Sequence, residues 1–119
     1  MSMCDEHVPV IRNLVSLDLW RCKFASPETI VTIAKSCKDL EEIDIGWCHN
    51  VLRVQFDHRF LFGNCKKLKK VFLTSGRIID DTYLNSIATF CSDIELLDIL
   101  GSNQVTNTGI LRYSVLYSS

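Results

Sequence analysis

The chain has 119 residues, of which 47% are hydrophobic and 23% are charged, a balance typical of one folded domain or a piece of one. Its formal net charge of -1 gives no overall attraction to nucleic acid or to an anionic membrane surface. No apolar run approaches the roughly 20 residues of a membrane-spanning helix, and the first residues lack the charged and apolar regions of a signal peptide. The sequence therefore predicts neither a nucleic-acid partner nor a membrane partner.

An apolar pattern, L-x-x-L-x-L, recurs four times at intervals of 26, 28 and 26 residues. The copies begin at Leu14, Leu40, Leu68 and Ile94. A period of this length is typical of leucine-rich repeats, in which each unit is one short strand and one return helix. The predicted fold is an α/β leucine-rich-repeat solenoid, a right-handed β-α superhelix in the form of a partial horseshoe, with a parallel sheet on its concave side. We predict repeats at 14–39, 40–67, 68–93 and 94–119, after an N-terminal remnant or cap at 1–13.

Helix signals return with the same period. The residues predicted to cap helix N-termini are Ser26, Asp80 and Thr106. Pro27 follows the first of them at the first helical position, where proline is favoured. The second repeat breaks the rule, because Val54 takes the cap position and His58 the first apolar position. Its return segment is therefore predicted to be irregular.

Five of the six cysteines occupy two fixed positions of the repeat. Cys22 and Cys48 lie at the predicted strand-to-loop corners, and Cys37, Cys65 and Cys91 at the predicted helix ends. A small apolar side chain with a weak donor suits such corners, so we predict Cys22 and Cys48 to be buried. Because equivalent cysteines recur once per coil and no C-x-x-C pair occurs, we expect neither disulfides nor a zinc site.

The remaining chemistry gives weak signals. A metal site around Cys48 and His49, or a cysteine nucleophile with His7, His49 or His58, would require the repeat positions of the cysteines to be coincidental. We therefore expect no catalytic residue, no metal and no cofactor. The basic run from Cys65 to Lys70 could touch phosphate or an acidic protein, but we favour a solvated turn in which Leu68 is the buried member.

Alternate residues of each strand are predicted to point outward from the sheet. The first outward column holds Ser16, Glu42, Lys70 and Leu96, the second Asp18, Asp44, Phe72 and Asp98, and the third Trp20, Gly46, Thr74 and Leu100, with Arg21 and Trp47 at the rim. Exposed aromatic side chains are common interface anchors. The candidate partner-binding residues are Asp18, Trp20, Glu42, Asp44, Trp47, Lys70, Phe72, Asp98 and Leu100. The alternative is that the tryptophans cover the strand edge and the aspartates solvate the sheet.

Between residues 14 and 111 the chain resembles a known family. The units LDLWRCKF, LEEIDIGWC and VTNTGI, with their C-x-x-L helix ends, resemble the cysteine-containing leucine-rich repeats of F-box proteins. The resemblance implies substrate reception in a Skp–cullin–F-box (SCF) E3 ubiquitin ligase, acting in ubiquitin-dependent protein degradation. In that family the F-box docks to the Skp-type adaptor, and the repeats hold the protein substrate.

The sequence departs from the family at one point, since it contains no F-box and residues 1–13 are too few to hold one. A Skp-type adaptor and cullin are therefore expected as partners only through an F-box outside this sequence. We expect a repeat portion, a short isoform or a truncated product of the family. Three hypotheses follow: the substrate-recognition region of a ligase, a stand-alone leucine-rich-repeat scaffold or competitor, and an enzyme. For the third, no pattern in the sequence indicates a group of catalytic residues.

The predicted location is the cytoplasm, with the nucleus as the alternative, since the cysteines are expected to be reduced and no secretion signal is seen. A mitochondrial association is implied by the family resemblance alone.

Overall fold

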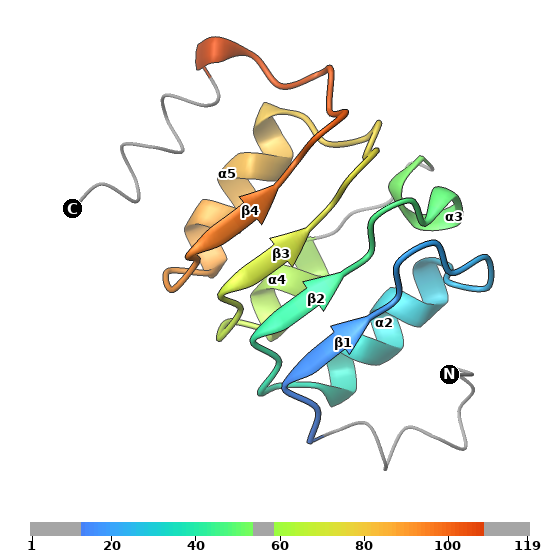
Figure 1. The fold of residues 1–119 in the computed structure, drawn as a ribbon. Coiled ribbons are helices and arrows are strands. Elements are labelled where there is room, and N and C mark those ends of the chain that lie inside the picture. The colour runs from blue at the N-terminus through green and yellow to red at the C-terminus, as the bar shows by residue number, and fades with distance from the viewer. Residues whose placement is uncertain (1–12, 54–58, 109–119) are drawn as a thin grey trace.

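In the computed structural model, four short strands pair in parallel in the order of the chain (Figure 1). The structure describes residues 13–53 and 59–108. The strands are β1 (Ser16–Asp18), β2 (Glu42–Asp44), β3 (Lys70–Phe72) and β4 (Leu96–Asp98). Their register places equivalent repeat residues side by side, so that Leu17 pairs with Ile43, Ile43 with Val71, and Val71 with Leu97. The predicted parallel pairing and register are confirmed, and the α/β arrangement is compatible with leucine-rich repeats.

Four helices return the chain between strands. They are α2 (Pro27–Ser36), α3 (His49–Leu52), α4 (Arg59–Asn64) and α5 (Asp81–Phe90). Figure 1 shows α2, α4 and α5 behind the sheet, on one of its faces. No helix in the described part of the chain is long and apolar enough to cross a membrane.

The core lies between the sheet and these helices. Ile43 of β2 and Ile45, which follows that strand, are fully buried, as are Ile30, Ile33 and Ala34 of α2. Their i, i+3, i+4 spacing is that of one helical face, so the apolar period explains both why the segment is helical and which side it buries.

The predicted helix starts hold at α2 and α5. The hydroxyl of Ser26 accepts from the backbone N–H of Thr29 at 3.4 Å, the hydroxyl of Thr29 accepts from the N–H of Ser26 at 3.1 Å, and Pro27 follows. A carboxylate oxygen of Asp80 accepts from the N–H of Tyr83 at 2.9 Å. Thr106 directly precedes the helical residues 107–108, and the groups that it was predicted to cap lie partly outside the described residues.

The second repeat is irregular, as its spacing predicted. Where repeats one and three each have a ten-residue helix, the described part of repeat two has the four-residue α3 and the six-residue α4. Val54 and His58, the residues that break the pattern, lie outside the described residues. The predicted segment 1–13 lies outside them as well, except for residue 13.

The cysteines form part of the core, with one exception. Cys37, Cys48, Cys65 and Cys91 are fully buried. The prediction for Cys22 was wrong, because its side chain is only half-buried. It lies in the first repeat, and no described residue of an earlier repeat covers it.

Buried thiols donate hydrogen bonds to the backbone of the preceding repeat. The thiol of Cys48 donates to the carbonyl oxygen of Leu19 at 2.8 Å, and that of Cys65 to the carbonyl oxygen of Cys37 at 3.3 Å. Cysteine therefore serves at these corners both as a small apolar side chain and as a donor between repeats.

Candidate functional site

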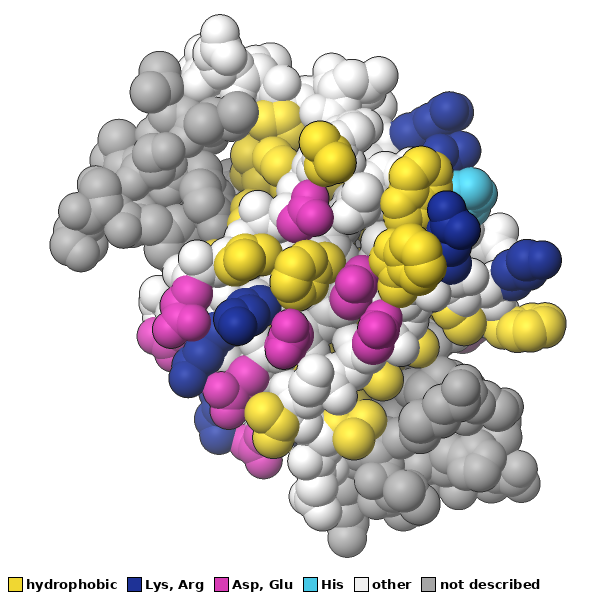
Figure 2. Space-filling view, in the orientation of Figure 1, with side chains coloured by type: hydrophobic (Ala, Val, Ile, Leu, Met, Phe, Trp, Pro, Cys, Tyr) yellow, Lys and Arg dark blue, Asp and Glu magenta, His cyan; other side chains and the backbone are white. Residues whose placement is uncertain are grey.

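The candidate site is the side of the sheet away from the helices, and no described helix covers it. We call the outward residues of the four strands the sheet face. They are Ser16, Asp18, Glu42, Asp44, Lys70, Phe72, Leu96 and Asp98. Figure 2 shows apolar and acidic side chains interleaved over this side of the molecule, with basic side chains at its margins.

The register builds two rows across this face. One row runs through Ser16, Glu42, Lys70 and Leu96, and the other through Asp18, Asp44, Phe72 and Asp98. Both rows were predicted as outward columns. The sheet face carries four carboxylates against one lysine, whereas the whole chain has a formal net charge of only -1. Negative charge is therefore concentrated on this face.

Each aspartate in the second row is held by the same local bond. A carboxylate oxygen of Asp18 accepts from the N–H of Trp20 at 2.9 Å, and that of Asp44 from the N–H of Gly46 at 2.8 Å. In repeat four, Asp98 accepts from the N–H of Leu100 at 2.9 Å. This is the bond of an Asx turn, in which the side chain satisfies backbone two residues further on. The carboxylates thus take the same position in repeats one, two and four.

These turns were missed by the sequence analysis, although their signal is present in the sequence. An aspartate lies between the last two apolar residues of the pattern in three of the four repeats, and an aspartate side chain commonly accepts a hydrogen bond from the backbone two residues further on. Repeat three has Phe72 instead, and Thr74 of that repeat donates its hydroxyl to Asp98 at 3.2 Å.

Asp44 lies at a crowded point of the face. Burial chiefly raises the pKa of its carboxyl, and the charges of Asp18, Asp98 and Glu42 raise it further, while the N–H of Gly46 acts in the opposite direction. The carboxylates of the sheet face therefore repel one another, and a cation placed among them would relieve that repulsion.

Beyond the aspartates, two tryptophans and an arginine stand at the carboxyl edge of the sheet. Trp20 is 50% exposed and Trp47 38% exposed. The guanidinium carbon of Arg21 lies 4.6 Å from the ring centroid of Trp20 and 5.7 Å from that of Trp47. Both distances are within the range of cation–π attraction. We call Trp20, Arg21 and Trp47 the tryptophan–arginine rim.

Gly46 makes room for this rim. A Cβ atom at Gly46 would lie 3.2 Å from Cδ1 of Trp20 and 3.3 Å from Cβ of Thr74. The glycine that interrupts the third outward column therefore allows the indole of Trp20 to lie against the neighbouring repeat. Leu100, at the far end of that column, is 73% exposed.

The rim also contains a repeated backbone conformation that the sequence analysis missed. Left-handed φ angles occur at Arg21 (58°), Trp47 (60°), Ser75 (67°) and Gly101 (86°). These residues have the same 26, 28 and 26 spacing as the repeats, yet only the last is glycine. An L-residue in this region costs roughly 1–2 kcal/mol. Repeats one, two and three thus accept a cost at Arg21, Trp47 and Ser75 that glycine would avoid.

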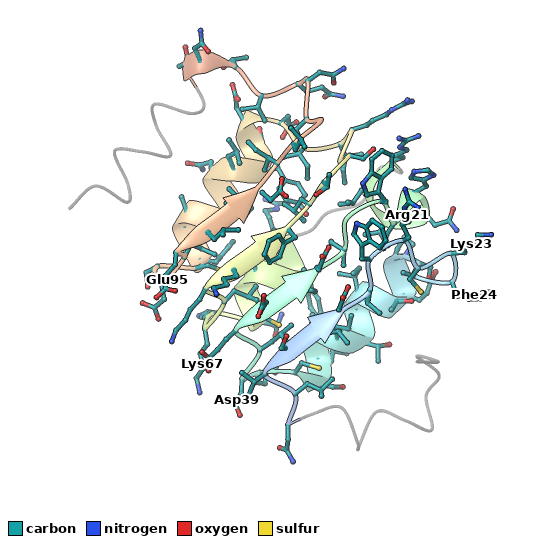
Figure 3. The ribbon with its side chains drawn as sticks, in the orientation of Figure 1. Arg21, Lys23, Phe24, Asp39, Lys67 and Glu95 are labelled. Carbon is teal, nitrogen blue, oxygen red and sulfur yellow. The ribbon has the colours of Figure 1, made fainter. Side chains whose placement is uncertain are left out.

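Phe24, in the loop between β1 and α2, is a large apolar side chain that is 92% exposed, and the sequence pattern did not single it out. Figure 3 shows Arg21, Lys23 and Phe24 near the ends of the strands, with Asp39, Lys67 and Glu95 at the opposite edge of the sheet.

That opposite edge contains the basic run, in which two of the four lysines form ion pairs. Lys67 lies 2.6 Å from a carboxylate oxygen of Asp39, and Lys69 lies 3.1 Å from one of Glu41. Leu68 is fully buried, as predicted. The run is therefore a turn in which Lys67 and Lys69 pair with acidic residues of the preceding repeat. A shallow depression of about 260 Å³ adjoins it, lined by Val15, Ser16, Glu41, Glu42, Lys69, Lys70 and Glu95.

The buried thiols are poorly suited to nucleophilic chemistry. Burial raises the pKa of Cys48 to about 11, that of Cys65 to about 11 and that of Cys91 to about 12, so these thiols stay protonated near neutral pH. His49 is exposed, while His7 and His58 lie outside the described residues. Within residues 13–53 and 59–108, no group of three His, Cys, Asp or Glu side chains is placed to hold a metal ion.

Comparison with curated proteins finds a local match to F-box/LRR-repeat protein 4 of Bos taurus, with 37% identity over 81 residues. Within the family named above, the stretches LDLWRCK, EEIDIGWC, KKVFLTSGR and LLDILGS also indicate a likeness to that protein. The match supports a relationship to F-box/LRR-repeat proteins. It covers 68% of this chain but only 13% of the relative. No protein-family model matches the sequence.

Proposed function

We propose that this chain is a segment of a leucine-rich-repeat solenoid and acts as a protein-binding module, with the sheet face and the tryptophan–arginine rim as its contact surface. The observation that carries the proposal is the exposure of Trp20, Trp47 and Leu100 along a side of the sheet that no described helix covers. Aromatic side chains in such a setting are typical anchors of protein interfaces. The proposed role is non-enzymatic.

The biological setting we propose is substrate recognition by an SCF-type E3 ubiquitin ligase in ubiquitin-dependent protein degradation. Its support is the local match to a protein whose name contains both F-box and LRR-repeat. In this role the chain would hold the protein to be ubiquitylated, and the adaptor and cullin would be reached through an F-box outside this sequence.

The size of the face explains why the rim belongs to the surface. Four strands about 4.8 Å apart and about 10 Å long give a face of roughly 200 Å², whereas a standard interface buries about 800 Å² on each partner. The side chains beyond the strands, above all Trp20, Trp47 and Phe24, must therefore supply much of any contact.

The test compares proteins that co-purify with the full chain and with its variant Trp20→Ala/Phe72→Ala. The matched control is Phe60→Ala, which truncates an exposed aromatic side chain on α4, in the helix layer. A specific partner should be lost from the double variant and kept by the control, and both variants should show wild-type circular dichroism. A partner retained by the folded double variant would refute this surface.

The second hypothesis is a stand-alone scaffold or competitor. The other proteins that co-purify with the chain distinguish it from the ligase role. If the native gene product brings down a Skp-type adaptor and cullin, and the partner accumulates when that product is depleted, the ligase role is supported. If the partner binds without adaptor or cullin and its abundance does not respond, the scaffold or competitor role replaces it.

A further inference from the structure

We propose that the partner of this surface is a lysine- or arginine-bearing segment of another protein. It places cationic side chains on Asp18, Asp44 and Asp98, which we call the aspartate row, and an apolar side chain against Phe72 or the tryptophan–arginine rim. This inference rests on the proposed function, since it specifies the partner of that same surface.

Several large apolar side chains are exposed on this surface. Trp20, Trp47, Leu96 and Leu100 are exposed, and Phe72 is half-buried between two carboxylates of its row. A protein that leaves side chains of this size together on one face commonly uses them for binding. Phe72, with Asp44 on one side and Asp98 on the other, offers an apolar contact between two anions.

The sheet face is acidic. The sheet face carries Asp18, Glu42, Asp44 and Asp98 against Lys70 alone, in a chain that is otherwise nearly neutral. Two ion pairs, at Lys67 and Lys69, lie at the opposite edge of the sheet. The aspartate row is thus left to repel itself, and a basic segment is the partner whose charge complements it.

The spacing of the carboxylates also suits such a partner. Asp44 and Asp98 are separated by one intervening strand, which puts them about 10 Å apart with Phe72 between them. The Asx turns fix the direction of both carboxylates. Two basic side chains on either side of an apolar one would match this arrangement.

The backbone of the rim is strained. Arg21, Trp47 and Ser75 adopt left-handed φ angles at the position where repeat four has Gly101. Ser75 is buried and its hydroxyl accepts from the guanidinium of Arg53, whereas Arg21 and Trp47 are exposed. Strained backbone that glycine would relieve is commonly kept where its side chain has a function. The guanidinium of Arg21 is already placed against both indoles, so the rim offers the partner flat apolar surface, while the free anions lie on the adjoining row.

The experiment is a selection from a display library of randomised 12-residue peptides against the full chain. A second bait is the triple variant Asp18→Asn/Asp44→Asn/Asp98→Asn. Asparagine keeps an oxygen that can accept the turn N–H bond, so the variant removes charge while preserving the local structure. A matched control bait, Asp93→Asn, removes one carboxylate from the exposed loop before β4.

We expect the wild-type and Asp93→Asn baits to enrich peptides in which lysine or arginine adjoins apolar residues, and the triple variant to lose that enrichment. A selected peptide, titrated against the chain, should bind at least tenfold more weakly to the triple variant and should weaken with added salt. Trp20 and Trp47 are the only tryptophans in the sequence, so their fluorescence reports this binding directly if the peptide lacks tryptophan.

Peptides without a basic bias, equal enrichment on the triple variant, or no enrichment at all would each overturn the inference. A Trp20→Ala/Phe72→Ala bait separates this failure from that of the proposed function. If selected peptides have no basic bias but are lost from that bait, only the partner chemistry is wrong. If the folded double variant keeps them, the surface itself is wrong.

Discussion

Raising the pH from 8 to 10 should destabilise the folded chain, because its buried cysteines must stay protonated to remain in the core. Burial raises the pKa of Cys48 and Cys65 to about 11 and that of Cys91 to about 12, from an ordinary value of 9.0. A raised pKa in the folded state means that the unfolded chain loses these protons first. The contribution to stability is therefore complete below pH 9 and is lost as the pH rises toward 11–12.

The size of the effect follows from these values. At pH 10 each of the three thiols favours the unfolded state by about 1.4 kcal/mol, because the unfolded thiolate forms while the folded thiol does not. Together they remove about 4 kcal/mol, a large fraction of the 5–15 kcal/mol that stabilises a typical domain. Burial also raises the pKa of the Tyr83 hydroxyl, which acts in the same direction.

The measurement is urea unfolding of the full chain at pH 8 and pH 10, in the presence of a reducing agent and followed by far-UV circular dichroism. The control is Cys91→Ala, which should be less stable than wild type at pH 8 but should lose about 1.4 kcal/mol less on going to pH 10. A wild-type loss below about 1 kcal/mol, or an unchanged loss in the variant, would refute the assignment of these thiols to the core.

Three substitutions test the elements that position the site, each by urea unfolding at pH 7. Gly63→Ala in α4 should raise the free energy of unfolding by about 0.5–1 kcal/mol, because the new Cβ would meet only Phe90, at 3.9 Å; a loss of stability would contradict the contact found there. Gly101→Ala should lower it by roughly 1 kcal/mol or more, because φ is +86° at that position, and a neutral result would show that the turn is not held in this conformation. Asp80→Ala should lower it by about 1 kcal/mol through loss of the bond to the N–H of Tyr83, whereas Asp80→Ser should restore most of the loss.

The parallel sheet and its register were predictable because the period of the apolar pattern is imposed by packing. Ile43, Val71 and their equivalents must point inward together, so the apolar pattern fixes both the strands and their register. The burial of Cys48 and Cys65 was predictable from the same period. Cys22 did not, because burial at a corner also depends on the repeat beside it, and repeat one has no described neighbour on that side.

The site was predictable only as a set of outward positions. The sequence placed Asp44, Phe72 and Trp20 on one surface, because alternation along a strand requires it. It did not reveal that Arg21 would lie against two indoles, or that Asp39 would pair with Lys67, since these contacts depend on rotamers and loop paths. One signal was available, because Asp39 and Lys67 occupy equivalent positions 28 residues apart with opposite charges.

The two faces of the sheet carry different kinds of information. Inward positions are apolar in every repeat, because a polar side chain there would be buried without a hydrogen-bond partner. The second outward row reads Asp18, Asp44, Phe72 and Asp98, and its one aromatic member cannot be explained by packing into that core. Stability therefore leaves the outward row free to vary, and the departure at Phe72 and the non-glycine turns at Arg21 and Trp47 are the places where binding best explains the choice of residue.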